Sequence, residues 1–191
     1  MKRREIVLNE DQVRAMLQKA KETSQRDHLL LSLMVNCGFR RAELVGGDDG
    51  RVPEQKRLPG IRIENLRDGG VYILGKKADR EVLVPIPLPL LTEIHQYIGK
   101  RTTGPLFDYS TDGVRKVCLK YAKAAGIPDW ERAHPHRLRH FFITRVAKQT
   151  GRDPWKTRDL ARHKNIATTN RYVAELDPGE KAEIARQIEI V

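Results

Sequence analysis

The residues whose types and spacing could do chemistry are concentrated between His134 and Tyr172. This stretch opens with HPHRLRHFFITR and closes with LARHKNIATTNRYV, and it holds four of the six histidines of the chain. Arginine and histidine donate hydrogen bonds to phosphate oxygens, and a deprotonated tyrosine can attack phosphorus. We therefore take His136, Arg139, His163 and Tyr172 as a candidate cluster for handling a phosphodiester.

The first half of the stretch is typical of a helix that begins near His136. Such a helix places His136, Arg139 and His140 close together over its first turn. The N-terminal end of a helix also favours phosphate, because unpaired N–H groups and the helix dipole point there. The pattern therefore predicts an anion clamp, with the apolar residues Phe142, Ile143 and Val146 on the buried face.

A metal site is the rival interpretation of the same histidines. His134, His136 and His140 include an i, i+4 pair that could share a zinc ion. Arg137 and Arg139 would lie beside the cation, however, and no carboxylate or cysteine is near in the sequence. The anion clamp is therefore favoured.

The second half of the stretch predicts two short helices with a turn around His163. It also suits a helix-turn-helix, in which four polar residues of the second helix and its turn would touch DNA: Lys164, Thr168, Thr169 and Arg171. A tyrosine hydroxyl has an unperturbed pKa of about 10, so Tyr172 needs nearby positive charge to act as a nucleophile at neutral pH. A core or DNA-stacking aromatic is the alternative role for this tyrosine.

Composition favours a polyanionic partner. Lys and Arg total 36 against 25 Asp and Glu, which gives a formal net charge of +11 and a pI near 9.9. Nucleic acid is the obvious candidate, and a merely soluble basic protein is the alternative. The acids and bases are interspersed, which favours a folded basic face over a disordered tail.

Cysteine usage and hydropathy predict a cytoplasmic protein. Cys37 and Cys118 are far apart, lack metal-ligand spacing and sit in apolar contexts, which indicates core thiols in a reducing compartment. The basic start MKRREIVLNEDQ has no apolar stretch behind it, and no segment approaches membrane-spanning length.

The elements that must position the cluster predict a mainly α fold with one small antiparallel β-sheet. Helices are expected over residues 9–20, 28–37, 90–98 and 111–125. Asn9 and Gln12 predict a capping box at the start of the first, and the second is expected to be buried because it is apolar nearly all round. A surface loop is expected over residues 46–60. The segments IRIEN, VYILG and EVLVPIP, separated by RDGG and KKADR, predict a three-stranded meander.

Two further charged positions lie outside the opening stretch. Arg40 and Glu43 are three residues apart in a short helix that follows Gly38, so they are neighbours on one face. Arg40 is either an exposed helix-start arginine or an arginine held by Glu43 at the edge of the core and aimed at an anion. Lys76 and Lys77 lie at the rim of a hairpin, where they reach a neighbouring groove or are simply solvated.

Taken in order, CGFRRAEL, LGKKADREVLVPIP, PHRLRHFFITR and LARHKNIATTNRYV resemble the motif series of the tyrosine recombinases, the phage-integrase and Xer-like family. The resemblance covers the chain from about Leu8 to Val173. It implies the catalytic-domain fold of that family and cleavage of one DNA strand by tyrosine, which leaves a 3′-phosphotyrosyl link and a free 5′-hydroxyl. It implies neither a metal nor a nucleotide cofactor, and chemistry like that of type IB topoisomerases. A non-catalytic basic DNA-binding module is the alternative.

The resemblance also assigns roles to positions of this sequence. It makes Arg40 and Arg139 the catalytic arginines, Glu43 the acid that accompanies the first of them, and Tyr172 the nucleophile. His136 belongs to the same box as Arg139, and His163 precedes the nucleophile; His140 is expected to support them. The hairpin lysine that protonates the leaving oxygen is Lys76 or Lys77; the preceding glycine favours Lys76. Contacts to double-stranded DNA are expected from Arg41, Arg137, Lys164, Thr168, Thr169 and Arg171.

The chain departs from the family pattern in two places. The loop over residues 46–60 is longer than usual, and Arg162 stands where a glycine commonly precedes the histidine. The expected organisation is a catalytic domain over residues 1–176 without the N-terminal core-binding domain of the family. Residues 177–191 are expected to form a helix that docks on a neighbouring protomer in a homo-oligomer on DNA, with packing on its own domain as the alternative.

Overall fold

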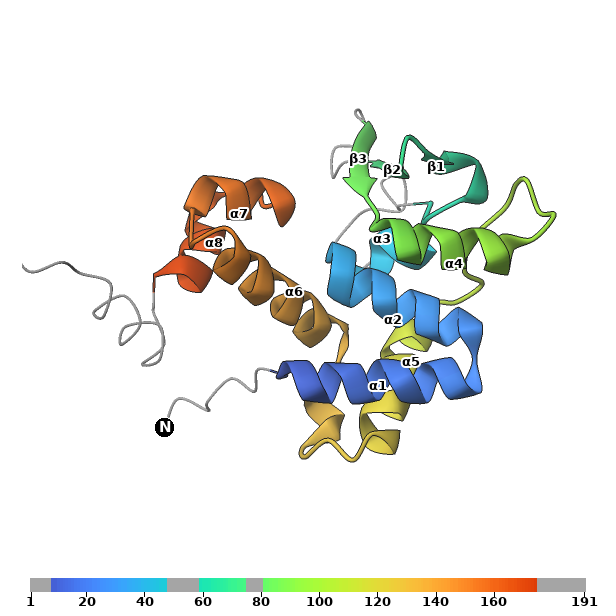
Figure 1. The fold of residues 1–191 in the computed structure, drawn as a ribbon, viewed down its shortest axis with the longest axis horizontal. Coiled ribbons are helices and arrows are strands. Elements are labelled where there is room, and N and C mark those ends of the chain that lie inside the picture. Colours follow the sequence, from blue (N-terminus) through green and yellow to red (C-terminus); the bar gives the residue numbers. More distant parts are fainter. Residues whose placement is uncertain (1–7, 48–58, 75–80, 175–191) are drawn as a thin grey trace, which may run out of the picture. The chain divides into compact units, whose positions relative to one another are not determined.

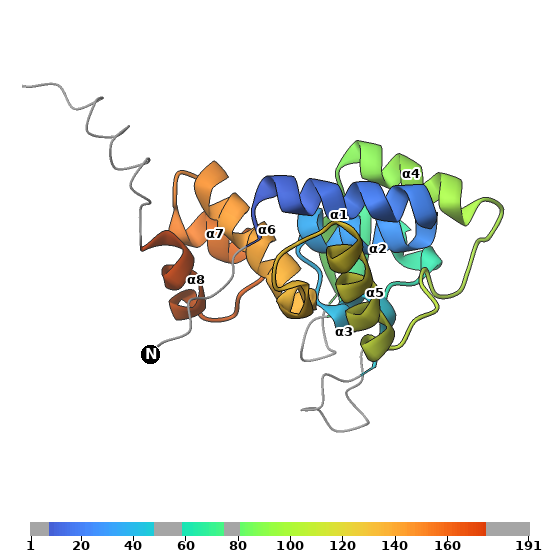
Figure 2. The same cartoon turned by 90° about the horizontal axis from the view of Figure 1, so that it is seen from below.

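The computed structural model describes residues 8–47, 59–74 and 81–174 (Figures 1 and 2). The described chain is mainly helical with a three-stranded antiparallel sheet, which confirms the predicted fold class. It divides into two compact units, Met1–Phe142 and Ile143–Val191, with the boundary inside helix α6 (Pro135–Gln149). None of the helices in the described ranges is long and apolar enough to cross a membrane.

The first unit is built around helix α2 (Gln25–Cys37). This helix packs against α1 (Glu10–Thr23), α4 (Leu88–Ile98) and α5 (Thr111–Ala124), which surround it in Figures 1 and 2. Every residue from Leu29 to Val35 is buried. A helix that is apolar on all sides needs such cover, so the sequence-based prediction of a central buried helix is confirmed.

Helix α1 begins with the capping box that the sequence predicts. The Asn9 side chain accepts a hydrogen bond from the Gln12 N–H, and the Gln12 side chain accepts one from the Asn9 N–H. Val13, Met16 and Ala20 are buried along one face. Ser24 then ends α1 and caps α2, so the two helices are joined through a single residue.

One predicted strand is wrong. Ile61 and Ile63 are both buried, as an alternating strand requires, but their main-chain partners lie outside the sheet. The Ile61 N–H donates to the Leu44 carbonyl oxygen at 3.0 Å, and the Ile63 N–H donates to the Gly104 carbonyl oxygen at 2.9 Å. Ile63–Asn65 forms a short 3-10 helix, η2, and the first strand of the sheet is only β1 (Leu66–Arg67).

The rest of the sheet follows the predicted meander. Strand β2 (Gly70–Leu74) lies between β1 and β3 (Glu81–Pro85), and both pairs are antiparallel. The turn between β1 and β2 has positive φ angles at Asp68 (53°) and Gly69 (74°), as a type I′ turn requires. The turn between β2 and β3 falls in residues 75–80, outside the described residues.

A polar network ties α2 to α5 inside the first unit. Asp27 is 4% exposed, and its carboxylate accepts hydrogen bonds from the hydroxyls of Tyr109 (2.5 Å) and Tyr121 (2.9 Å). Burial, followed by the hydrogen bond to Asp27, raises the pKa of Tyr109 to about 12. The network satisfies a buried charge that would otherwise destabilise the core.

The two cysteines lie in the core, as predicted. Cys37 and Cys118 are both free and buried. Burial raises the pKa of the Cys118 thiol above its ordinary value, so this group is not a ready nucleophile. The remaining elements of the first unit are α3 (Arg41–Val45), which packs against α5, and the short 3-10 helix η3 (Trp130–Arg132).

The second unit contains the C-terminal half of α6 and two short helices that pack together, α7 (Pro154–Leu160) and α8 (Ile166–Val173). Asp153 caps α7 by accepting from two backbone N–H groups, those of Trp155 at 2.8 Å and Lys156 at 3.0 Å. Asn165 caps α8 by accepting from the Ala167 N–H at 2.9 Å. Two short helices with a turn around His163 are therefore confirmed.

Candidate active site

The junction between α2 and α3 has a geometry that only glycine fits. Gly38 ends α2 with φ at 63°, in the left-handed region that L side chains rarely adopt. A Cβ atom at this position would also overlap the ring of Phe142. The chain then extends through Arg40 and enters α3 at Arg41, so Arg40 stands at the end of the buried helix.

Glu43 holds Arg40 at two points. Its Oε1 accepts from Nη1 of Arg40 at 2.6 Å, and its Oε2 accepts from the Arg40 backbone N–H at 2.8 Å. The Glu43 side chain is 7% exposed and that of Arg40 is 32% exposed. This geometry agrees with the second interpretation from the sequence, an arginine fixed by its acid at the edge of the core.

Arg139 reaches the same junction from α6. Its side chain is 4% exposed, and its Nη1 donates to the carbonyl oxygen of Gly38, a residue 101 positions away in the sequence. Gly38 precedes Arg40 by two residues, so both predicted catalytic arginines converge on one bend of the first unit. Neither arginine motif indicates this meeting by itself.

The histidines of this region lie around the start of α6. His136 is exposed on its first turn, whereas His134 and His140 are half-buried, as are Arg41 and Arg137. Burial, reinforced by the charges of Arg137 and His136, lowers the pKa of His134. Within the described ranges, no three His, Cys, Asp or Glu side chains gather as a metal site.

The hairpin lysine stays a prediction. Lys76 and Lys77 both fall in residues 75–80, which lie outside the described residues. The choice between them therefore rests on the sequence alone.

In the second unit, a tight turn presents His163. Arg162 has φ at 53°; its N–H donates to the Asp159 carbonyl oxygen and the His163 N–H donates to that of Arg158, both at 3.0 Å. These two bonds make a Schellman motif at the end of α7, whose left-handed position is usually occupied by glycine. The conformation accounts for the glycine that the family commonly carries where this chain has Arg162.

His163 is tied to α8, the helix that carries Tyr172. Its Nδ1 lies 2.9 Å from the hydroxyl oxygen of Thr169, and its ring centroid lies 6.1 Å from that of Tyr172. Thr169 and Tyr172 are three residues apart and so share one side of α8. The structure therefore brings His163 and Tyr172 together within this unit.

Arg152 contacts the carboxyl end of α8. Its Nη1 donates to the Tyr172 carbonyl oxygen at 3.1 Å, in the last turn of α8, where a helix supplies no further N–H groups of its own to its carbonyls. Sequence reasoning missed this residue. Its only signal is a basic side chain after the end of α6, which is too common to be informative.

The expected DNA contacts differ in exposure. Lys164 and Arg171 are exposed and Thr168 is half-buried, whereas Thr169 is fully buried. The expectation that Thr169 touches DNA does not agree with this burial, because its hydroxyl points to His163 instead. The spacing of Thr169 and Tyr172 in the sequence indicates that they share one side of α8. The spacing does not indicate where the Thr169 hydroxyl points.

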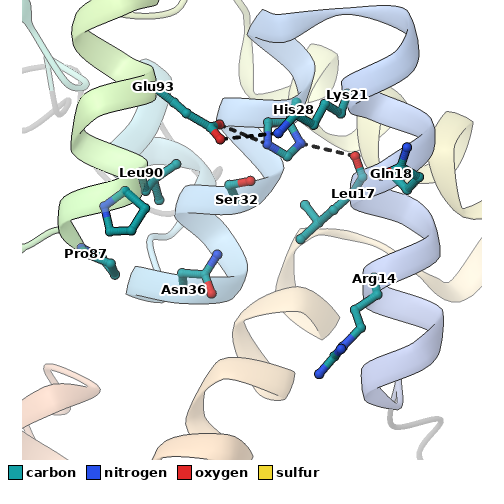
Figure 3. A pocket seen from close by; sticks show the side chains of 11 residues that line it. Arg14, Leu17, Gln18, Lys21, His28, Ser32, Asn36, Pro87, Leu90 and Glu93 are labelled. Atoms are coloured by element: carbon teal, nitrogen blue, oxygen red, sulfur yellow. Dashed lines mark hydrogen bonds and ion pairs between the residues drawn. The ribbon is translucent and has the colours of Figure 1, made fainter.

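A groove of about 470 Å³ lies elsewhere in the first unit, between α1, α2 and α4 (Figure 3). Nε2 of His28 lies 3.2 Å from the Glu93 carboxylate there, and Nζ of Lys21 donates to the same carboxylate at 3.4 Å. The other ring nitrogen of His28 lies 3.1 Å from the Leu17 carbonyl oxygen. None of the predicted site residues lines this groove.

Comparison with known proteins covers nearly the whole chain. The profile of the phage integrase family matches residues 6–178. The tyrosine recombinase XerA of Pyrococcus furiosus is 28% identical, over 86% of this chain and 56% of its own length. A tyrosine recombinase of Pseudothermotoga lettingae is 33% identical, over 81% of this chain and 51% of its own length. The chain thus spans about half the length of these curated relatives.

Solved structures share the fold. The crystal structure of XerA recombinase superposes with a TM-score of 0.72 at 19% identity, covering 100% of this chain and 68% of that one. The catalytic domain of bacteriophage HP1 integrase gives a TM-score of 0.58 at 18% identity and covers 94% of this chain and 93% of that one. With the profile match and the identities above, these likenesses identify the chain as a member of the phage integrase family, the Xer-like tyrosine recombinases.

Proposed function

We propose that this chain carries the catalytic centre of a site-specific DNA recombinase that cuts and rejoins strands through a 3′-phosphotyrosyl intermediate at Tyr172. The observation that supports this most is the meeting of Arg139 with the Gly38 carbonyl, beside an Arg40 that Glu43 holds at 2.6 Å. Two fixed guanidinium groups at one bend form a ready-made site for a phosphodiester.

The proposed roles follow from the charge of each side chain and from its ability to donate or accept a proton. Arg40 and Arg139 would contact the non-bridging oxygens and stabilise the charge that develops on the pentacoordinate phosphorus. His136 would accept the proton of the Tyr172 hydroxyl as its oxygen attacks. His163 would donate a hydrogen bond to a phosphate oxygen.

The leaving group needs a proton as well. The bond between the tyrosine oxygen and phosphorus forms while the bond from phosphorus to the 5′-oxygen breaks, and Lys76 or Lys77 would protonate that 5′-oxygen. The phosphotyrosyl link conserves the energy of the broken ester, so religation to a 5′-hydroxyl needs no nucleotide. None of these roles calls for a metal ion.

Double-stranded DNA is the proposed partner. Solved neighbours include XerH recombinase bound to its difH substrate and the Tn1549 integrase in complex with circular intermediate DNA. The net charge of +11 and the exposed side chains of Lys164 and Arg171 suit such a partner. Binding should weaken with salt at a slope of about −0.9 per phosphate contacted, and a flat response would contradict the proposal.

We further infer that residues 1–176 act as the catalytic domain and that residues 177–191 contact a neighbouring protomer in a homo-oligomer on DNA. Removal of residues 177–191 should then reduce multimeric protein–DNA complexes in gel shifts while single-protomer complexes persist. Unchanged multimers would contradict the protomer contact.

The test of the chemistry is covalent capture. A pool of duplexes with randomised arms and a nick just 3′ of each candidate scissile phosphate releases a short strand after cleavage and so traps the protein on DNA. The wild type should form a denaturant-resistant adduct, Tyr172→Phe should form none, and Tyr97→Phe, a matched change at a half-buried tyrosine of α4, should behave like the wild type. DNA binding without any adduct would refute catalysis and favour the DNA-binding module.

A further inference from the structure

Thr169 is a buried threonine whose hydroxyl contacts His163, a predicted active-site residue. Its side chain is fully buried, and its hydroxyl oxygen lies 2.9 Å from Nδ1 of His163. Among the described residues, that nitrogen is the one hydrogen-bond partner of the hydroxyl. By contrast, the hydroxyl of Thr150, just after α6, donates to the carbonyl oxygen four residues earlier, that of Val146, at 3.0 Å.

The direction of this hydrogen bond follows from proton counting. A threonine hydroxyl has one proton, and a buried donor without an acceptor costs about 1–3 kcal/mol. If Nδ1 of His163 carried the ring proton, it would donate to the threonine oxygen and leave the hydroxyl proton of Thr169 without an acceptor. If the hydroxyl donates instead, every proton at this contact is satisfied, and the ring proton of neutral His163 lies on Nε2.

We propose that Thr169 is a positioning residue that holds His163 in the Nε2–H tautomer, so that Nε2–H is the group presented to the scissile phosphate. The proposal rests on the proposed function for its role at the phosphate, but the tautomer is a property of the protein alone. A neutral imidazole with this proton placement can donate to an anion without first being protonated.

The same contact fixes the geometry between the two functional rings. Thr169 and Tyr172 lie on one side of α8, so the bond to Thr169 anchors His163 to the helix that carries the nucleophile. The ring planes of His163 and Tyr172 are inclined by 34°, with centroids 6.1 Å apart. Without the Thr169 hydroxyl, neither the position of the ring proton nor the orientation of the His163 ring would be fixed.

The primary test reads the tautomer by NMR. In the ¹⁵N-labelled full chain without DNA, at a pH where histidines are neutral, long-range ¹H–¹⁵N correlations should show His163 protonated at Nε2. Thr169→Val, which keeps the shape and removes the hydroxyl, should shift His163 toward a mixture of tautomers, and Thr169→Ser should restore Nε2–H. Protonation at Nδ1 in the wild type, or an unchanged tautomer in Thr169→Val, would overturn the proposal.

Thr157→Val is the matched control. Thr157 is also a fully buried threonine of the second unit, but its hydroxyl lies 2.9 Å from that of Thr150 rather than from a histidine. Thr157→Val should leave the His163 tautomer unchanged. A shift as large as that of Thr169→Val would mean that loosened packing moves the tautomer, and it would overturn the specific role of Thr169.

The second arm measures covalent adduct formation on the nicked duplexes. By analogy with metal-binding histidines that lose their outer hydrogen-bond partner, Thr169→Val should slow adduct formation about tenfold to a hundredfold. Thr169→Ser should recover most of the rate. Equal rates for Thr169→Val and the wild type would overturn the positioning role. If no protein forms an adduct, the proposed function fails, whereas the NMR result still decides the tautomer.

Discussion

Glu43→Gln is the sharpest perturbation of the first unit, because Glu43 both caps α3 and holds Arg40. The carboxylate makes two charge-assisted contacts, at 2.6 Å to the guanidinium and at 2.8 Å to the backbone N–H. Glutamine keeps the size but offers one acceptor oxygen, so one of these donors loses its partner. Hydrogen bonds to charged groups contribute about 1.5–3 kcal/mol each. We therefore expect the free energy of unfolding to fall by about 2–3 kcal/mol.

Glu22→Gln is the control for this change. Glu22 forms an ion pair with Lys19 at the same i, i+3 spacing and at 3.1 Å, but both side chains are about half exposed. Exposed pairs of this kind contribute little to stability, because water and salt screen them. Urea unfolding of the two variants and the wild type compares the loss in unfolding free energy at a buried acid with that at an exposed one. Equal m-values would confirm that the unfolding transition itself is unchanged.

Catalysis supplies the second readout. Once Glu43 no longer fixes Arg40, adduct formation on nicked duplexes should fall by about a hundredfold, measured at a temperature where the variant is fully folded. Equal stability losses in Glu43→Gln and Glu22→Gln would refute the energetic argument. A large stability loss with an unchanged adduct rate would refute the role of Glu43 in positioning Arg40.

Three further outcomes are expected in the first unit. Asp27→Asn should lower the free energy of unfolding by about 2 kcal/mol in urea titrations, because the hydroxyls of Tyr109 and Tyr121 lose a charged acceptor. Folding raises the pKa of Tyr109 from 10.0 to about 12, so between pH 10 and pH 12 the folded state binds more protons than the unfolded state. The free energy of unfolding should therefore fall as the pH rises from about 10 to about 12. Tyr109→Phe should make this fall shallower. Gly38→Ala should cost about 2–4 kcal/mol by thermal or urea unfolding, from left-handed strain and overlap with Phe142; a loss under about 1 kcal/mol would contradict the described bend.

Features encoded locally could be predicted from the sequence. The Asn9 capping box, the apolar α2 with its terminal glycine and the Arg40–Glu43 pair all lie within a few residues, and the structure confirms each of them. Spacing within one helix fixes which side chains are neighbours, so periodicity is sufficient for these features.

Features that depend on distant partners could not be predicted. The alternation of IRIEN is compatible with a strand, but the main-chain partners of Ile61 and Ile63 come from Leu44 and Gly104, whose proximity no local pattern indicates. Thr169 was expected to contact DNA because it falls in the second helix of a possible helix-turn-helix. Its burial depends on how α7 and α8 pack, which the sequence of α8 alone does not specify.

In the proposed reaction, Tyr172 becomes covalently joined to a 3′-phosphate of DNA. Trypsin digestion of the trapped adduct, followed by nuclease trimming and mass spectrometry, tests it directly, because Arg171 places Tyr172 at the start of a tryptic peptide. We expect a nucleotide remnant on Tyr172 in the peptide that begins YVAELDPGEK, and a free 5′-hydroxyl on the released strand. A remnant on any other residue, or a 5′-linked nucleotide, would contradict it.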